Sequence, residues 1–231
     1  MKTRGKKKVF GRILLALVCV AVVIVSAYAI FGRQWMLRMG STTEELAAQM
    51  PGDYLLDSAA PHFFTYQQAV TIAAPPQYAW PYIVQMGYQR GGWYNLDFIN
   101  NASAQGKYFY ENGKSADRVI LELQTLNKGD LIYLVPDAVK LEVNDLKQDE
   151  YLLLRGGNDT KTDVTWAYVL KPVDETHTRL IVRWREVQTG DFMAHVMNKL
   201  IVEPGGAGVQ QALNIRGIAS RAERDFRAAG K

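Results

Sequence analysis

Residues that could carry chemistry fall into three groups, each beside a predicted turn or strand. One group lies in and just after a glycine-rich turn, a second leads into a run of predicted strands, and a third alternates along a late strand. In chain order the groups are Arg90, Tyr94 and Asp97, then Asp117, Arg118 and Glu122, then Arg183 and Arg185 on either side of Trp184. A carboxylate or tyrosine beside an apolar pocket can serve as a general acid or base, but no spacing here requires that role. We therefore predict no catalytic residue and keep Asp97, Glu122 and Tyr94 as the candidates of an enzymatic alternative.

The two late arginines share one face of their strand, because side chains alternate between faces at every residue. Arg183 and Arg185 lie on one face and Trp184 on the other. Outward-facing arginines would pair with acids such as Glu142 or Asp163, and this interpretation is favoured because charged residues are rarely buried. Inward-facing arginines would need an anionic partner, and the carboxylate or phosphate head group of a lipid-like ligand would serve.

Aromatic residues next to turns are further candidates for a binding site, since loop aromatics are needed less for packing. Trp93 and Tyr94 directly follow two glycines, and Trp166 lies within a predicted strand. Such rings can line an apolar pocket, although aromatic residues more often belong to an ordinary core. The predicted ligand-binding set is Arg90, Trp93, Tyr94, Asp97, Arg118, Glu122, Trp166 and Arg183.

The sequence shows no residues spaced to bind a metal ion or a cofactor. The histidines, His62, His177 and His195, have no metal-ligand spacing, and the single cysteine, Cys19, lies in an apolar amino-terminal run. The glycines of Gly206-Ala207-Gly208 lack the third glycine and the strand-helix-strand unit of a dinucleotide site. We predict no metal and no cofactor.

The elements that would position these residues begin with the stretch from Tyr66 to Tyr94. Gln68 to Ala73 has strand character and stops at Pro75-Pro76, which sets φ for the first turn of a helix. Apolar residues then recur at intervals of three and four as far as the glycine turn. A second short helix is predicted near Leu96 to Asn101.

Past Asp117 the chain is predicted to form an antiparallel meander that ends in a long helix. Turn residues separate strands at 131–135, 139–144, 151–155, 164–173 and 178–187. Glu203 to Gly208 is predicted to interrupt the regular structure. The long helix follows, from about Val209 to Ala228, with an alanine-rich apolar stripe. The alanines either leave room for a cavity under the sheet or permit close packing. The loop Ala102 to Lys114 is either a lid over a cavity mouth or a variable surface loop.

The amino-terminal residues predict a membrane segment. Met1 to Arg12 is basic without an acid, and Ile13 to Phe31 is uncharged over nineteen residues, enough to cross a bilayer at about 1.5 Å per residue. The basic flank would keep the amino terminus in the cytoplasm and place the carboxy-terminal domain on the extracytoplasmic side of the inner membrane. A cleaved signal peptide is the alternative, since Ala27-Tyr28-Ala29 fits a cleavage pattern.

The net charge of +4 does not indicate nucleic-acid binding, because six basic residues precede the apolar run and exceed the whole imbalance. After that run, Thr42 and Glu45 fit a capping box that would start a short helix ending near Met50. The predicted domains are a basic cytoplasmic tail at 1–12, a transmembrane helix at 13–31, a juxtamembrane helix and linker at 32–65, and the folded domain at 66–231.

The segment APPQYAWPYIVQMGYQRGGWYNLD at 74–97 resembles the opening of SRPBCC domains, the START and birch-pollen-allergen helix-grip superfamily. It is most similar to bacterial members described as polyketide cyclase/dehydrase or lipid-transport-like. SADRVILELQTLNKGD at 115–130, TRLIVRWRE at 178–186 and GIASRAERDF at 217–226 follow in family order, while Leu121 stands where a proline is expected before Glu122. The resemblance implies an α+β helix-grip fold, a curved antiparallel sheet wrapped around a long C-terminal helix. It specifies the fold more than the activity, since the superfamily includes carriers, cyclases and regulators.

Together these patterns predict a membrane-tethered domain that binds a hydrophobic or amphipathic, lipid-like small molecule in an internal cavity. Its expected partners are that molecule and, through the amino-terminal helix, the membrane; the sequence names no protein partner. A cyclase- or hydratase-like enzyme acting on a hydrophobic substrate and a non-catalytic protein-interaction scaffold are the alternatives. Inward carboxylates that meet in a cavity would favour the enzyme, an apolar tunnel the carrier, and a filled core the scaffold.

Overall fold

The computed structural model describes residues 3–104, 113–135, 139–158 and 161–230. The chain divides into two compact units, Met1–Met36 and Leu37–Lys231. The first unit holds helix α1 (Thr3–Ala27), the π-helical turn η1 (Tyr28–Gly32) and most of α2 (Arg33–Leu37). The domain boundaries predicted at residues 12, 31 and 65 stay predictions.

The predicted transmembrane helix and the single-pass localisation in the inner membrane are wrong. Within the described part of the chain, the structure contains no helix with both the length and the apolar character needed to cross a membrane. The α-helical part of the predicted span stops at Ala27 rather than Phe31, because a π-helical turn takes over at Tyr28. A span needs about 20 consecutive apolar residues in a helix.

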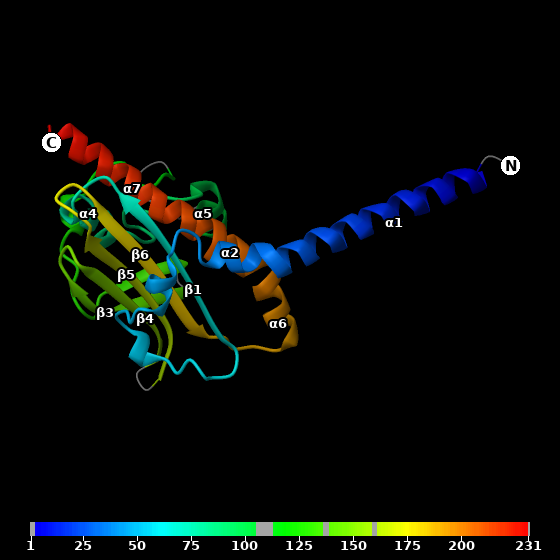
Figure 1. Cartoon of the computed structure of the whole chain (residues 1–231), viewed down its shortest axis with the longest axis horizontal. Coiled ribbons are helices and arrows are strands. Elements are labelled where there is room, and N and C mark those ends of the chain that lie inside the picture. The colour runs from blue at the N-terminus through cyan, green and yellow to red at the C-terminus, as the bar shows by residue number, and fades with distance from the viewer. Residues whose placement is uncertain (1–2, 105–112, 136–138, 159–160, 231) are drawn as a thin grey trace. The chain divides into compact units, whose positions relative to one another are not determined.

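The second unit is built on one antiparallel sheet of six strands in the order β1-β6-β5-β4-β3-β2 (Figure 1). Five strands form the meander that the turn signals predict, and β1 pairs with β6 to close the order. The strands are β1 (Phe63–Ile72), β2 (Leu131–Val135), β3 (Val139–Lys147), β4 (Tyr151–Asn158), β5 (Lys161–Pro172) and β6 (Thr178–Val187).

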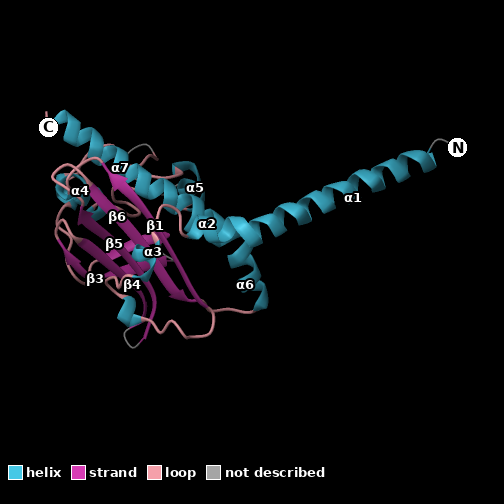
Figure 2. Cartoon of the chain, viewed as in Figure 1, coloured by secondary structure: helices cyan, strands magenta, loops and turns pink. Residues whose placement is uncertain are grey.

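Helices α4 and α7 pack together, and α7 also packs on β1 (Figure 2). Helix α4 (Pro76–Val84) has proline at its first position, as the sequence predicts, because the missing amide donor is not needed there. Helix α7 (Gln211–Ala228) turns its alanine-rich face to the core, which it shares with residues of the sheet such as Leu152 and Val182. A single antiparallel sheet with a long C-terminal helix against it fits the expected α+β helix-grip fold.

Short helices complete the unit. They are α3 (Thr43–Ala47), η2 (Asp53–Leu55), α5 (Asp97–Ser103), η3 (Leu121–Leu123), α6 (Phe192–Met197) and the π-helical segment η4 (Asn198–Gln210). The capping box predicted for α3 is present, with Thr42 and Glu45 each hydrogen-bonding the other's backbone N–H. The break predicted at Glu203 to Gly208 is wrong, because the wider π-helical turns of η4 carry the chain through Pro204 and into α7.

The side of the sheet opposite α7 is covered by the segment that holds α3 and η2. Arg183 donates from Nη1 to the Ala48 carbonyl at 3.0 Å and forms an ion pair with Asp53, and Arg185 lies 3.4 Å from the same carboxylate. The two arginines therefore share a face, as predicted, but they pair with Asp53 rather than with Glu142. The favoured outward orientation with an acidic partner is found, but the acid is Asp53, and a folded segment covers the arginines where solvent was expected.

Candidate functional site

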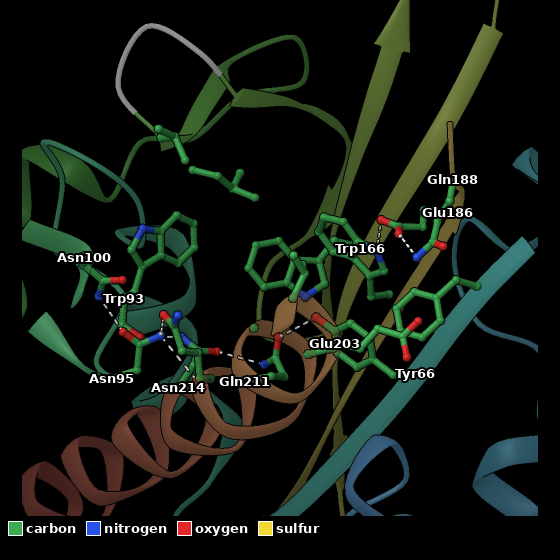
Figure 3. Close-up of a pocket in the computed structure, with 18 residues that line it drawn as sticks. Tyr66, Trp93, Asn95, Asn100, Trp166, Glu186, Gln188, Glu203, Gln211 and Asn214 are labelled. Atoms are coloured by element: carbon green, nitrogen blue, oxygen red, sulfur yellow. Dashed lines mark hydrogen bonds between the residues drawn. The ribbon is translucent and has the colours of Figure 1, made fainter. Parts of the chain in front are cut away.

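A cavity of about 360 Å³ lies where α7 and η4 face one end of the sheet (Figure 3). Its walls come from β1, the end of β2, β5, β6, the loop before α5, α5 itself, η4 and the start of α7. Eighteen residues line it: Phe64, Tyr66, Trp93, Asn95, Asn100, Leu134, Val135, Trp166, Trp184, Glu186, Gln188, Val202, Glu203, Gly206, Ala207, Gln210, Gln211 and Asn214.

An arc of aromatic rings forms the sheet side of the cavity. Strand register places Tyr66 and Trp166 opposite Trp184, one on each side of it, so the three side chains share a face. Trp166 and Trp184 meet edge to face at 5.4 Å between ring centroids, and Tyr66 stacks on Trp184 at 6.3 Å. Trp93, from the loop opposite, stacks on Trp166 at 5.6 Å.

A chain of hydrogen bonds through buried amides forms the helix side. The Tyr66 hydroxyl donates to Gln211 Oε1 at 3.2 Å, and Gln211 Nε2 donates to Asn214 Oδ1 at 3.1 Å. Asn214 Oδ1 also accepts from Tyr168, and its Nδ2 donates to the Trp93 carbonyl at 2.7 Å. The Asn214 amide thereby holds the backbone of Trp93 against the first turns of α7.

The glycine-rich turn brings Trp93 to this position. Gly87 and Gly92 pair with each other across the turn, and both have positive φ, which side chains with a Cβ rarely adopt. Ser115 Oγ accepts from the Tyr94 backbone N–H at 2.9 Å, and the same hydroxyl donates to Asp97 Oδ1 at 2.6 Å. Asp97 therefore supports the turn rather than facing the cavity.

Burial suppresses ionisation of the tyrosines in and behind the site. Desolvation raises the pKa of Tyr66 far above its usual value, with a smaller contribution from the Glu186 carboxylate. Desolvation likewise raises the pKa of Tyr168 and Tyr94. These hydroxyls stay neutral at physiological pH.

One buried donor in the lining lacks a protein partner. The indole Nε1 of Trp166 makes no hydrogen bond to any described residue, although Trp166 is only 7% exposed. Buried polar groups are normally paired, and leaving one unpaired costs about 1–3 kcal/mol. The nitrogen is itself buried, so it is an unpaired donor within the wall of the cavity.

Of the eight residues in the predicted ligand-binding set, the structure brings only Trp93 and Trp166 to the cavity. Arg90 donates to the carbonyls of Val84, Met86 and Leu123 and so ties the glycine turn to α4. The others also lie elsewhere: Tyr94 is buried under Arg221, Asp97 caps Ser115, Arg118 and Glu122 are exposed, and Arg183 is on the opposite face of the sheet.

Sequence reasoning missed the polar half of the lining. Gln211 and Asn214 sit three residues apart at the start of α7, and an amide pair on the otherwise apolar face of a helix was the available signal. Glu186 continues the alternation that places Trp184 inward, so it too could have been identified from the strand pattern. Residues of η4 had no such signal, because a break was predicted there. The predicted lid, 102–114, falls largely on residues outside the described part of the chain.

No described group of three histidine, cysteine, aspartate or glutamate side chains is placed to hold a metal ion. The cavity lining therefore contains aromatic rings, amides and two carboxylates, of Glu186 and Glu203. Such a lining can enclose a small apolar molecule and hydrogen-bond its polar end.

No protein-family model matches the chain, and no curated protein matches its sequence. Among solved structures it is similar to the ZhuI aromatase/cyclase from Streptomyces sp. R1128, with 15% identity over 73% of this chain and 99% of that one, at a TM-score of 0.42. It is also similar to CalC, a self-sacrificing resistance protein from Micromonospora echinospora, with 11% identity over 70% of this chain and 95% of that one, at a TM-score of 0.40. An HSP90 activator from Plasmodium falciparum is similar with 10% identity over 66% of this chain and 94% of that one, at a TM-score of 0.36.

Proposed function

We propose that this protein binds a hydrophobic or amphipathic small molecule in the aromatic cavity. The observation that carries the proposal is an aromatic-lined space of about 360 Å³ between the sheet and the helices η4 and α7. Ligand sites are commonly about 300–1,000 Å³, mostly apolar, with a few polar groups that fix orientation. An apolar ligand body would lie against Trp93, Trp166 and Trp184.

The two alternative functions receive less support. The residues on which the enzymatic alternative depended, Asp97, Glu122 and Tyr94, do not line the cavity. A scaffold for protein contacts would not need an internal cavity of this size, since voids in protein interiors are few and small.

The proposal is tested by native mass spectrometry of the full-length protein, purified from cells without denaturation. Two glycines of η4 provide a matched pair of variants, because a Cβ at Gly205 or Gly206 would meet no atom within 4 Å. Only Gly206 lines the cavity. Gly206→Leu should take up cavity volume and leave the fold intact, and Gly205→Leu should change neither.

A small-molecule adduct is expected on the wild-type protein and on Gly205→Leu, and it should be lost from Gly206→Leu. Extraction of the adduct would identify the ligand. Equal adduct on both variants would place binding elsewhere, and a wild-type mass free of adduct, with no thermal shift from a panel of apolar compounds, would overturn the proposal.

A further inference from the structure

The charged residues in the described lining of the cavity are all acidic. Among its eighteen described residues, Glu186 and Glu203 carry carboxylates, and none is lysine, arginine or histidine. The arginines nearest in sequence, Arg183 and Arg185, alternate with Trp184 and Glu186 along β6. Their side chains therefore project from the opposite face of the sheet, where they pair with Asp53. An anionic ligand would find no countercharge among these eighteen residues.

Glu186 is held in place by neutral donors. Its Oε2 accepts from Trp184 Nε1 at 2.7 Å and its Oε1 accepts from Gln188 Nε2 at 2.8 Å (Figure 3). Among the described residues Glu186 has no ion pair within 4.0 Å. Two neutral hydrogen bonds orient the carboxylate without neutralising it, and each oxygen can accept further hydrogen bonds.

Aromatic rings surround this carboxylate. Phe64 stands opposite Glu186 across the β1–β6 ladder, and Trp184 and Tyr66 stack beside it. The faces of aromatic rings attract cations, by about 0.5–1 kcal/mol when exposed and about 2 kcal/mol when desolvated.

We propose that the ligand of this cavity is cationic, with an amine or quaternary ammonium group beside Glu186 and an apolar body against the tryptophans. The carboxylate supplies the countercharge, and the faces of Trp184, Tyr66 and Phe64 surround the cation. This inference rests on the proposed function, since it assigns the charge of a ligand for the same cavity. It also excludes the anionic lipid head group that inward-facing arginines would have required.

Three probes with the same eight-carbon chain and different head groups test the charge preference: octyltrimethylammonium, 1-octanol and octanoate. Each is titrated below its micellar concentration into the full-length protein, with isothermal calorimetry as the readout. We expect octyltrimethylammonium to bind about tenfold more tightly than octanoate, with octanol between them. Glu186→Gln should weaken octyltrimethylammonium by about fivefold and leave octanol within about twofold.

Glu150→Gln is the matched control, because Glu150 is 52% exposed and pairs with Lys147 in a turn away from the cavity. It should leave all three affinities unchanged. Octanoate binding as tightly as the ammonium compound, or an ammonium affinity that Glu186→Gln does not reduce, would overturn the cationic ligand while octanol binding still supported the cavity. Absence of binding by all three probes would overturn the proposed function itself.

Discussion

At the scale of single residues, burial decides which polar groups of this protein can act. Asn214 is 2% exposed, and its side-chain amide has partners on the sheet, on its own helix and on the loop of Trp93. A group so fully engaged is structural. Trp166 Nε1 and the carboxylate of Glu186 differ, since the first has no described partner and the second has only neutral ones. The carboxylate oxygens of Glu186 are the atoms that a ligand can reach with a net gain of interactions, because Trp166 Nε1 is itself buried.

The buried tyrosines predict how stability depends on alkaline pH. Desolvation raises the pKa of Tyr66, Tyr82, Tyr94 and Tyr168 above the value of about 10 that an unfolded tyrosine has. Their stabilising effect is fully present below pH 10 and is lost as pH rises, because the unfolded chain releases protons that the folded protein retains. Each such tyrosine lowers the free energy of unfolding by about 1.4 kcal/mol per pH unit above 10.

Urea unfolding of wild type and Tyr66→Phe between pH 9 and about 11.5 measures this dependence. We expect the free energy of unfolding of the variant to fall less steeply with pH than that of wild type. The difference in slope should equal the contribution of one tyrosine, whatever the stability of the variant at pH 8. Tyr54→Phe is the control, because Tyr54 is 78% exposed, and its slope should equal that of wild type. Parallel pH profiles for wild type and Tyr66→Phe would show that Tyr66 ionises in the folded protein.

At the scale of elements, α7 approaches the Trp93 loop more closely than a side chain allows. A Cβ on Gly217 would lie 2.2 Å from the Tyr94 carbonyl oxygen and 2.6 Å from Tyr94 Cβ. Glycine inside a helix normally costs about 1 kcal/mol relative to alanine. Here close contact with the loop outweighs helix propensity, and the glycine sets the distance between α7 and the cavity wall.

Gly217→Ala should therefore destabilise the protein, by about 1–3 kcal/mol, instead of stabilising it. Backbone atoms cannot yield as the end of a flexible side chain can, so α7 and the loop must separate. Ser220→Ala, at an exposed position of the same helix, is the control and should change stability by less than about 0.5 kcal/mol. Chemical denaturation measures both variants, and a stabilised Gly217→Ala would mean that the helix and loop adjust freely.

A second close junction ties the segment of α3 and η2 to the sheet. Arg183, with a side chain 10% exposed, donates to Gln67 Oε1 at 2.7 Å, to carbonyls of the segment and to Asp53. Removing one partner of a buried ion pair costs about 3–5 kcal/mol, whereas an exposed pair is worth about 0–1 kcal/mol.

Arg183→Met is expected to lower the free energy of unfolding by about 3 kcal/mol and to speed proteolysis between α3 and β1. Lys147→Met, which breaks an exposed pair on the same sheet, should do neither. Thermal melts and timed digestion distinguish the two variants. Unchanged digestion of Arg183→Met would show that apolar contacts alone hold the segment.

Elements with local signals were predictable from the sequence. Proline at the start of α4, the capping box of α3 and the turn residues between strands act over a few positions, so their effects do not depend on the rest of the fold. The π-helical path of η4 was not predictable, because Pro204 and the neighbouring glycines indicate a break unless tertiary packing overrides them.

At the scale of the whole molecule, the cavity is assembled from residues far apart in the chain. Trp93 and Trp166 were identified as aromatic candidates, but Gln211 and Asn214 join them in the cavity lining only once α7 lies beside the Trp93 loop, where Asn214 bonds the Trp93 carbonyl. Arg183 shows the opposite case, in which alternation correctly gave its face and could not give the segment that covers that face. The predicted site differs from the observed one because the sequence predicted the elements but not the contacts between segments that are far apart in the chain.

The two units of the chain lead to the last prediction. All three clusters of buried apolar residues lie within Leu37–Lys231, as do the sheet, α7 and every residue that lines the cavity. A unit with its own core is expected to fold by itself.

A protein that starts at Leu37 should therefore melt within about 2 °C of the full chain, a shift of less than about 1 kcal/mol for a domain of this size. It should also retain the octanol affinity of the full chain. A large fall in melting temperature would show that the first unit contributes to the core, and a loss of octanol binding at unchanged stability would place part of the binding site in residues 1–36.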